Sequence, residues 1–423
     1  TATMKTFVLA FVTCAALAAP TAVRAQEGAA GIGARLMQEP AVKSAIDRVK
    51  RNEEQVIDDQ LRLCEIPAPP FMEQARGEAL RRAFTAAGLK NVRVDAVGNV
   101  IGDRPGLAPR PRLVFTAHLD TVFPEGTKVV PSREGSILKG PGIGDDCRGL
   151  AVLLAVIREL DAAQIQTPGT ITFVATVGEE GLGDLRGVKH LFNNELKGQI
   201  DRFVSVDGSG LDITATAVGS LRYRVTFKGP GGHSYGAFGL ANPVHALGRA
   251  IAHIGDLQVP SSPKTTFNVG RIGGGTSVNS IPFEAWMEVD MRSADAASLK
   301  AIDAGFHKAV DRALAEENER WNNNGRLSVE KKLVGDRPAG ATPRNAAIVQ
   351  AAVSVTKAIG EEPVIGEGST DSNIAISLGI PAVTVDGGGN GSGAHSLAEQ
   401  FDATDSWKGT ARALLLAVAL AQK

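Results

Sequence analysis

A histidine and an aspartate two residues apart, His118 and Asp120, follow the sequence Arg-Leu-Val-Phe at 112–115, which is typical of a buried strand. In an extended backbone, side chains at positions i and i+2 point to the same side. The carboxylate can therefore reach the imidazole from behind, which would fix the tautomer of the ring and make it a better metal ligand. A single His-x-Asp pattern is more often a polar strand end on a loop, so its meaning depends on the rest of the chain.

Other acidic residues and histidines also follow predicted strands. In open α/β sheets, ligands bind at the carboxyl ends of the strands, so we expect these side chains at one edge of a sheet. They are Glu179 and Glu180 after residues 170–177, Asp207 after residues 202–206, His395 beyond residues 381–385, and Asp145 on a glycine-rich loop before the apolar helix predicted at residues 147–160.

This set of side chains suits a pair of metal ions. Two histidines and three or four carboxylates can hold two divalent ions if one carboxylate bridges them, and ions about 3.5–4 Å apart can clamp both oxygens of a hydrolysis. One of the paired glutamates can then bind metal while the other accepts the proton of a water molecule. Zinc is the expected metal, and a carboxylate-rich site also accepts cobalt or manganese.

In combination, these motifs resemble the co-catalytic zinc exopeptidase and amidohydrolase family that includes carboxypeptidase G, peptidase T, aminoacylase and succinyl-diaminopimelate desuccinylase. The resemblance covers nearly the whole chain apart from its N-terminus. The motifs that carry it are, in chain order, His-Leu-Asp-Thr at 118–121, Gly-Pro-Gly-Ile-Gly-Asp-Asp at 140–146, Glu-Glu-Gly at 179–181, a single aspartate after a strand, and Ala-His-Ser at 394–396.

The resemblance implies a set of metal ligands. His118 and Asp207 would hold one metal ion, Glu180 and His395 would hold the other, and Asp145 would bridge both.

It also implies roles beside the metals. Asp120 would orient His118, and Glu179 would be the general base and then the acid that protonates the leaving nitrogen. The peptide bond between Asp145 and Asp146 would be cis.

The chain departs from the family pattern directly after this aspartate pair. Cys147-Arg148-Gly149 stands where the family commonly has Lys-Gly. Arg148 would keep the positive charge one position later. Cys147 as a zinc ligand is an open but less favoured alternative.

A second group of motifs falls in the middle of the chain. The sequence Gly-Pro-Gly-Gly-His-Ser at 229–234 matches the lid motif of the family. The resemblance implies that His233 stabilises a tetrahedral oxyanion, often in the active site of the neighbouring subunit. Asn279 and Arg292 would contact the substrate, with Arg292 clamping a carboxylate. The alternatives are a turn-capping asparagine and a solvated arginine.

Two domains must position these residues, because 423 residues exceed one ordinary core. Strands alternate with helices over residues 41–217 and 335–423, which predicts a metal-binding α/β domain with a mostly parallel sheet and helices on both faces. Residues 218–334 follow the order β-α-β-β-α-β and predict an inserted ferredoxin-like α+β domain. By resemblance, this insertion is a lid through which the chain forms a homodimer.

The N-terminus predicts export. A positive residue, the apolar residues 7–19 and Val-Arg-Ala at 23–25 mark residues 1–25 as a signal peptide, with a three-residue remnant before Met4. The apolar run is too short to span a membrane. Residues 26–40 are expected to be a flexible linker. We therefore expect a periplasmic or secreted protein with no membrane attachment after cleavage.

An oxidising compartment permits a disulfide between Cys64 and Cys147. Two buried, unpaired thiols are the favoured interpretation from sequence.

Composition narrows the function further. A net charge of −1 and an aromatic content of 5% argue against nucleic acid and anionic membranes as partners. The leading hypothesis is metal-dependent hydrolysis of an amide bond in a small peptide or N-acyl amino acid. The alternatives are another two-metal hydrolase, such as a phosphoesterase, and a non-catalytic exported binding protein. Phosphate sites favour clusters of arginine and lysine, and every expected ligand position is filled, so both alternatives rank lower.

Overall fold

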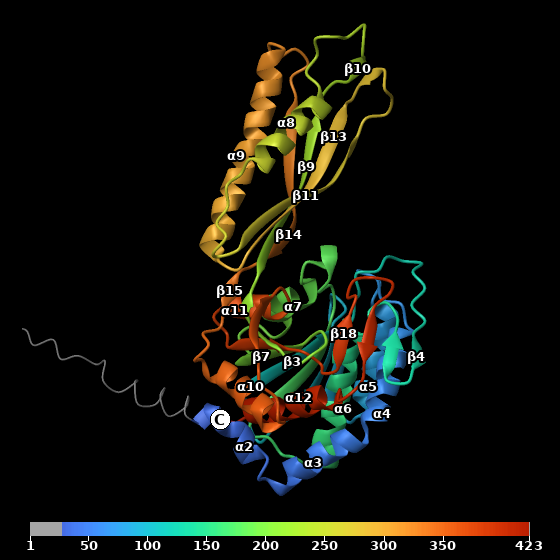
Figure 1. Cartoon of the computed structure of the whole chain (residues 1–423), viewed down its shortest axis with the longest axis vertical. Coiled ribbons are helices and arrows are strands. Elements are labelled where there is room, and N and C mark those ends of the chain that lie inside the picture. Colours follow the sequence, from blue (N-terminus) through green and yellow to red (C-terminus); the bar gives the residue numbers. More distant parts are fainter. Residues whose placement is uncertain (1–27, 423) are drawn as a thin grey trace, which may run out of the picture.

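The computed structural model describes residues 28–422, which form a large and a small domain (Figure 1). The predicted signal peptide, residues 1–25, lies outside the described residues. Within residues 28–422, no helix is both long enough and apolar enough to cross a bilayer.

The large domain is built on a nine-stranded sheet whose central strands are parallel. These central strands are buried along almost their whole length, because helices cover both faces of the sheet. The mostly parallel α/β fold predicted from sequence is therefore confirmed. In spatial order the strands are β1 (Lys90–Val94), β2 (Val100–Arg104), β6 (Thr170–Thr176), β3 (Arg112–His118), β7 (Arg202–Val206), β17 (Ala382–Val385), β8 (Ile213–Ala217) and β15 (Gly340–Ala341), and β16 (Ile365–Gly368) also pairs with β8.

Alternate residues of the central strands enter different cores. In β3, Leu113 and Phe115 face the main core, whereas Val114 faces a second core on the opposite side of the sheet. The main core is closed by α3 (Pro40–Arg51), α4 (Glu53–Cys64), α5 (Gln74–Ala86), α6 (Cys147–Ala162), α10 (Ala347–Ala358) and α12 (Trp407–Leu420). The second core is closed by α7 (Arg186–His190) and α11 (Ser372–Ser377).

The first described residues differ from the flexible linker predicted for them. They contain the short helix α2 (Ile32–Leu36), whose Leu36 is buried in the main core. The backbone N–H of Gly33 donates a hydrogen bond to Ser354 Oγ at 3.0 Å. A Cβ atom at Gly33 would lie 2.4 Å from the carbonyl oxygen of Ser354. Gly33 therefore allows two helices to approach closely. It does not give this segment the mobility that its many small residues suggest.

The small domain has a four-stranded antiparallel sheet in the order β11-β13-β9-β14. Two helices pack on one face of this sheet around a core of their own (Figure 1). The elements follow the predicted β-α-β-β-α-β order as β9 (Gly219–Lys228), α8 (Pro243–Gly255), β11 (Thr265–Gly274), β13 (Glu284–Ser293), α9 (Ala296–Arg320) and β14 (Ser328–Arg337). A two-stranded ribbon, β10 (Gly232–His233) and β12 (Ser280–Ile281), lies at the end far from the large domain.

A small third sheet joins two loops that are distant in sequence. Its order is β18-β19-β5-β4, formed by β4 (Ser132–Glu134), β5 (Ile137–Lys139), β18 (Asn390–Ser392) and β19 (Gln400–Asp402). The pairing of β19 with β5 brings the loop of residues 140–146 beside the loop that carries His395.

Cys64 and Cys147 form a disulfide, so the prediction of unpaired thiols is wrong. The two residues are 83 apart in the chain, but their Cα atoms lie 5.6 Å apart because the end of α4 abuts the start of α6. The bond also leaves Cys147 without a thiolate for a metal ion.

The core predicts which truncations destabilise the large domain. Leu414 of α12 is fully buried, so Leu414→Ala should lower the free energy of unfolding by about 2–5 kcal/mol through lost burial and a cavity. Leu107 is 71% exposed, and Leu107→Ala should change the free energy of unfolding by less than about 0.5 kcal/mol. Urea unfolding of both variants measures the difference, and equal midpoints would contradict the packing described.

Candidate metal centre

Three neighbouring parallel strands end at one rim of the large sheet. β3 ends at His118, β6 ends three residues before Glu179, and β7 ends directly before Asp207. Because β3 lies between β6 and β7, the residues that follow these strands meet above the central strand. The side chains that follow these three strands therefore lie at one edge of the sheet, as the sequence predicts.

Asp145 lies between two histidines. Its Oδ1 is 2.9 Å from His118 Nε2, and its Oδ2 is 3.1 Å from His395 Nε2. Glu180 Oε1 lies 3.1 Å from His395 Nε2, and Asp207 Oδ1 lies 3.7 Å from His118 Nε2.

These residues form groups that could each hold a metal ion. Each group offers ligand atoms within 4.8 Å of one another: His118, Asp145 and Asp207 form one, and Asp145, Glu180 and His395 form another. The two groups share Asp145, as a bridging carboxylate requires. A further group combines His118 with Glu179 and Glu180.

The electrostatics of the site favour bound cations. Burial raises the pKa of Asp207 and raises that of Glu179 well above its ordinary range, because the negative carboxylates have little water around them. Hydrogen bonds that protonated His395 donates to the carboxylates of Asp145 and Glu180 raise the pKa of His395 to about 10. Burial opposes protonation of His118, but Asp146, Asp145 and Asp207 together raise its pKa well above the ordinary value. The crowded carboxylates thus hold positive charge, and this donor set fits divalent metals.

The support of His118 takes a different form from the one predicted. The Nδ1 atom of His118 lies 3.0 Å from the backbone carbonyl oxygen of Asp120, and 3.7 Å from its carboxylate. The Asp120 carboxylate accepts hydrogen bonds from the backbone N–H groups of Glu179 and Glu180, at 3.0 and 2.8 Å. Asp120 therefore ties the histidine strand to the paired glutamates, and its carbonyl leaves Nε2 facing the site.

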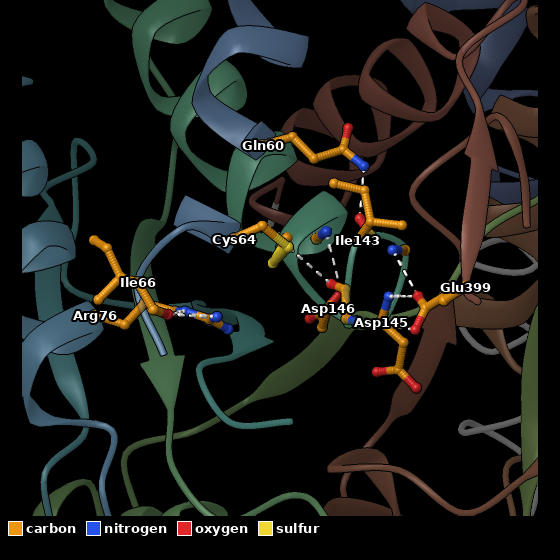
Figure 2. Close-up of a disulfide and its surroundings, with 12 residues drawn as sticks. Gln60, Cys64, Ile66, Arg76, Ile143, Asp145, Asp146 and Glu399 are labelled. Atoms are coloured by element: carbon orange, nitrogen blue, oxygen red, sulfur yellow. Dashed lines mark hydrogen bonds between the residues drawn. A yellow bond between two sulfur atoms is a disulfide. The ribbon is translucent and has the colours of Figure 1, made fainter. Parts of the chain in front are cut away.

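Asp146 and Glu399 hold the loop on which Asp145 lies. The carboxylate of Asp146 accepts hydrogen bonds from the backbone N–H groups of His118 and Gly149, at 2.9 and 3.0 Å. The Asp145–Asp146 peptide bond is cis, as the family resemblance implies. Glu399, four residues after His395, accepts backbone N–H groups of this loop, those of Gly142 at 2.9 Å, Gly144 at 2.8 Å and Asp145 at 3.1 Å (Figure 2).

Two further residues at the site have no recognisable sequence signal. Arg337, the last residue of β14, places Nη1 3.1 Å from Glu179 Oε1 and also bonds the Glu179 carbonyl oxygen. Arg76 is fully buried and donates a hydrogen bond from Nη1 to the carbonyl of Leu119, between the two residues of the His-x-Asp pattern, at 2.8 Å. Neither arginine belongs to a motif with characteristic spacing.

A cavity of about 680 Å³ lies between the domains beside these candidate ligands. Its lining includes Asp145, Glu180, Asp207 and His395 from the large domain and, besides Arg337, three further arginines of the small domain, Arg222, Arg271 and Arg292. Each of these three further arginines is also paired with an acidic residue of its own sheet.

His233 lies on the distal ribbon of the small domain, as the last residue of β10, and Asn279 directly precedes β12 of the same ribbon. The Nδ1 atom of His233 accepts backbone N–H groups of Tyr235 and Gly236 at 3.2 Å each. The Asn279 carbonyl accepts the N–H of Ser234 at 2.9 Å. Within this chain, they are not brought together with the metal ligands.

The fold and site define a two-domain α/β protein with a cluster of carboxylates and histidines at the strand ends that could hold metal ions. Residues 114–419 match the model of Peptidase family M20/M25/M40. The chain belongs to this family.

Known proteins agree with this assignment. The succinyl-diaminopimelate desuccinylase of Nitrosospira multiformis is 29% identical over 258 residues, which are 56% of this chain and 67% of that protein. The structure of a tripeptidase from Staphylococcus aureus superposes with a TM-score of 0.71 at 24% identity, over 88% of this chain and 99% of that one. The structure of the YXEP protein of Bacillus subtilis, described as a dinuclear metal-binding peptidase, superposes with a TM-score of 0.64 at 19% identity, over 87% of this chain and 98% of that one.

The raised histidine pKa values predict that metal binding releases protons. His395, with a pKa of about 10, is protonated in the metal-free protein at neutral pH and must lose its proton to bind a metal. Zinc affinity should therefore rise as pH increases from 6 to 8, and calorimetry in buffers of different ionisation enthalpy should show release of roughly one proton per histidine. His190→Gln should leave the proton count unchanged. An affinity independent of pH would contradict this reading.

Proposed function

We propose that the protein is an exported hydrolase that uses two divalent metal ions, zinc by default, to cleave an amide bond in a small peptide or N-acyl amino acid. The observation that carries the proposal is the position of Asp145, with one carboxylate oxygen on His118 and the other on His395. Asp207 and Glu180 complete two ligand groups that share this carboxylate. Cobalt or manganese would also suit these oxygen-rich groups.

Glu179 is the proposed general base and acid. When bound, the two ions would polarise the scissile carbonyl and lower the pKa of a water molecule toward neutrality. Glu179 would accept the proton of this water and return it to the leaving nitrogen. Burial raises the pKa of its carboxyl group well above the ordinary range, which suits a residue that takes and gives a proton near neutral pH. Asp120 and Arg337 hold Glu179 in place through its backbone N–H and its carboxylate.

Arg292 and the distal ribbon would recognise the substrate. Arg292 lines the cavity, and its guanidinium would clamp a substrate carboxylate. His233 would donate a hydrogen bond to the oxyanion, and Asn279 beside it would contact the substrate. Because their ribbon lies at the far end of the small domain, we propose that they serve the site of a second copy of the chain.

The small domain offers a surface for such a homodimer. β11 is an edge strand of the four-stranded sheet, and an unpaired edge can add a further strand. Ile272 on this strand is 62% exposed, and Val278 in the following turn is fully exposed.

Export and substrate class rest on separate grounds. Residues 1–25 have the pattern of a signal peptide, and a disulfide is typical of proteins in oxidising compartments. A tripeptidase and a succinyl-diaminopimelate desuccinylase are among the relatives, which supports peptides and N-acyl amino acids as the classes to test.

A substrate panel tests the proposal directly. The zinc-loaded protein is incubated with dipeptides, tripeptides, N-acyl amino acids and C-terminally amidated peptides, and the metal-free protein serves as the blank. We expect metal-dependent cleavage of at least one class, and the amidated peptides show whether a free carboxyl end is required. Failure to cleave any of them with both metals bound would favour the non-catalytic binding protein.

Glu179→Ala should retain both metal ions and lose about 10²–10⁴-fold in kcat, as expected for removal of a general base. The measurements are metal content after gel filtration and steady-state kinetics. Glu362→Ala is the control, because its side chain is 88% exposed on the surface. Retention of turnover by the Glu179 variant would remove this residue from the role of base.

His233→Ala should lower kcat by about 10²–10³-fold, as for loss of one oxyanion donor. His245→Ala, a half-exposed histidine of the same domain, should leave kcat unchanged. An effect confined to KM would contradict the oxyanion role. Mixing the His233→Ala and Glu179→Ala chains should restore part of the activity if His233 acts across a dimer.

A further inference from the structure

We propose that the Cys64–Cys147 disulfide is a positioning element of the metal centre, so that the chain binds its metals tightly only after this bond has formed. The inference rests on the proposed function, since it concerns the bridging residue Asp145. It goes beyond that function because it makes metal binding depend on a covalent bond between the end of α4 and the start of α6.

The disulfide lies directly beside the bridging residue. Cys147 is the first residue of α6 and follows Asp145 by two positions, while Cys64 is the last residue of α4. Both cysteines are fully buried. The bond therefore ties the end of the loop that carries Asp145 to a helix that begins almost a hundred residues earlier.

Helix α4 also holds the loop by contacts that are not covalent. The Nε2 atom of Gln60 donates a hydrogen bond to the carbonyl of Ile143 at 2.7 Å, and Gln60 is fully buried. The Cys64 sulfur lies 3.2 Å from the carbonyl oxygen of Gly142. Figure 2 shows Gln60 and Cys64 on one side of this loop and Glu399 on the other.

The loop is thus held from two opposite directions. Its carbonyl groups face α4, whereas its N–H groups at Gly142, Gly144 and Asp145 donate to Glu399. Glu399 belongs to the same segment as the other proposed metal ligand, His395, four residues before it. The contacts from α4, with the disulfide as their covalent part, add to the hydrogen bond from the His118 N–H to Asp146, which ties the same loop to β3.

The remaining packing indicates that the domain does not need the bond in order to fold. Helix α6 buries Leu150, Leu153 and Val156 in the main core. Cys64 and Cys147 instead belong to a small separate cluster with Ile143, Leu138 and Phe401 beneath the loop. Loss of the bond should therefore loosen the loop while the main core stays intact.

Formation of the bond requires an oxidant. Two thiols lose two protons and two electrons, which a disulfide of the glutathione class accepts as it becomes two thiols. Because both sulfurs are buried, reductants reach them poorly in the folded chain. We therefore expect the disulfide to influence metal binding when the protein first folds in an oxidising compartment, and not to act as a reversible switch afterwards.

The test compares the wild-type chain with the Cys64→Ala/Cys147→Ala double variant. A non-reduced tryptic digest of the wild type should contain residues 63–76 linked to residues 140–148. Zinc affinity, measured by competition with a chromophoric chelator, should be about 10–100-fold weaker in the double variant, the range for lost support of a metal ligand. In the metal-free proteins, amide hydrogen exchange of residues 140–148 should be faster in the double variant.

Two further variants separate this effect from general destabilisation. Leu414→Ala weakens the main core outside the cluster that contains Cys64 and Cys147, and it should leave zinc affinity and exchange of residues 140–148 unchanged. Gln60→Met keeps the disulfide and removes the hydrogen bond to Ile143, so it should weaken zinc binding in a chain that folds with the bond intact.

The outcomes are distinct. A double variant with wild-type zinc affinity and unchanged loop exchange would overturn the inference alone, and so would equal loss in Leu414→Ala. If the wild-type chain fails to bind zinc, cobalt or manganese, the proposed function falls, and the inference falls with it.

Discussion

The carboxylate of Asp145 has to meet two histidines at once, and much of the large domain depends on that constraint. His118 ends a central strand, whereas His395 lies on a loop 250 residues further along the chain than Asp145. Asp145 can contact both only if the loop before α6 stays fixed at the rim of the sheet. The helix cap, the hydrogen bonds and the disulfide around this loop all help to hold Asp145 between the two histidines.

Backbone N–H groups stabilise the carboxylates that lie behind the ligands. Asp120 accepts two such groups, Asp146 accepts two, and Glu399 accepts three. Backbone dipoles are fixed and do not compete for a metal ion, so these carboxylates can lie close to the site without becoming ligands. The negative charge that remains uncompensated faces the cavity, where a cation can bind.

The paired glutamates also connect the two domains. Arg337, at the end of the small domain's last strand, contacts Glu179, and Arg222 donates a hydrogen bond to the Gly181 carbonyl at 2.6 Å. The N–H of Asp336 donates to Asp184 at 2.7 Å. The loop of residues 179–184 therefore lies between the domains, and the orientation of the small domain bears on the position of the proposed base.

Local patterns in the sequence determined the sheet, the order of elements in both domains and the residues at the strand ends. Apolar runs, glycine turns and short motifs are each set within a few neighbouring residues, so they can be recognised without knowledge of packing. Only the tertiary structure decided that Asp120 supports the glutamates, that Gly33 permits a close helix contact, and that Cys64 bonds to Cys147. Arg337 and Glu179, 158 residues apart, meet for the same reason: such pairs depend on distances that the packing of whole elements sets, and sequence spacing carries no record of them.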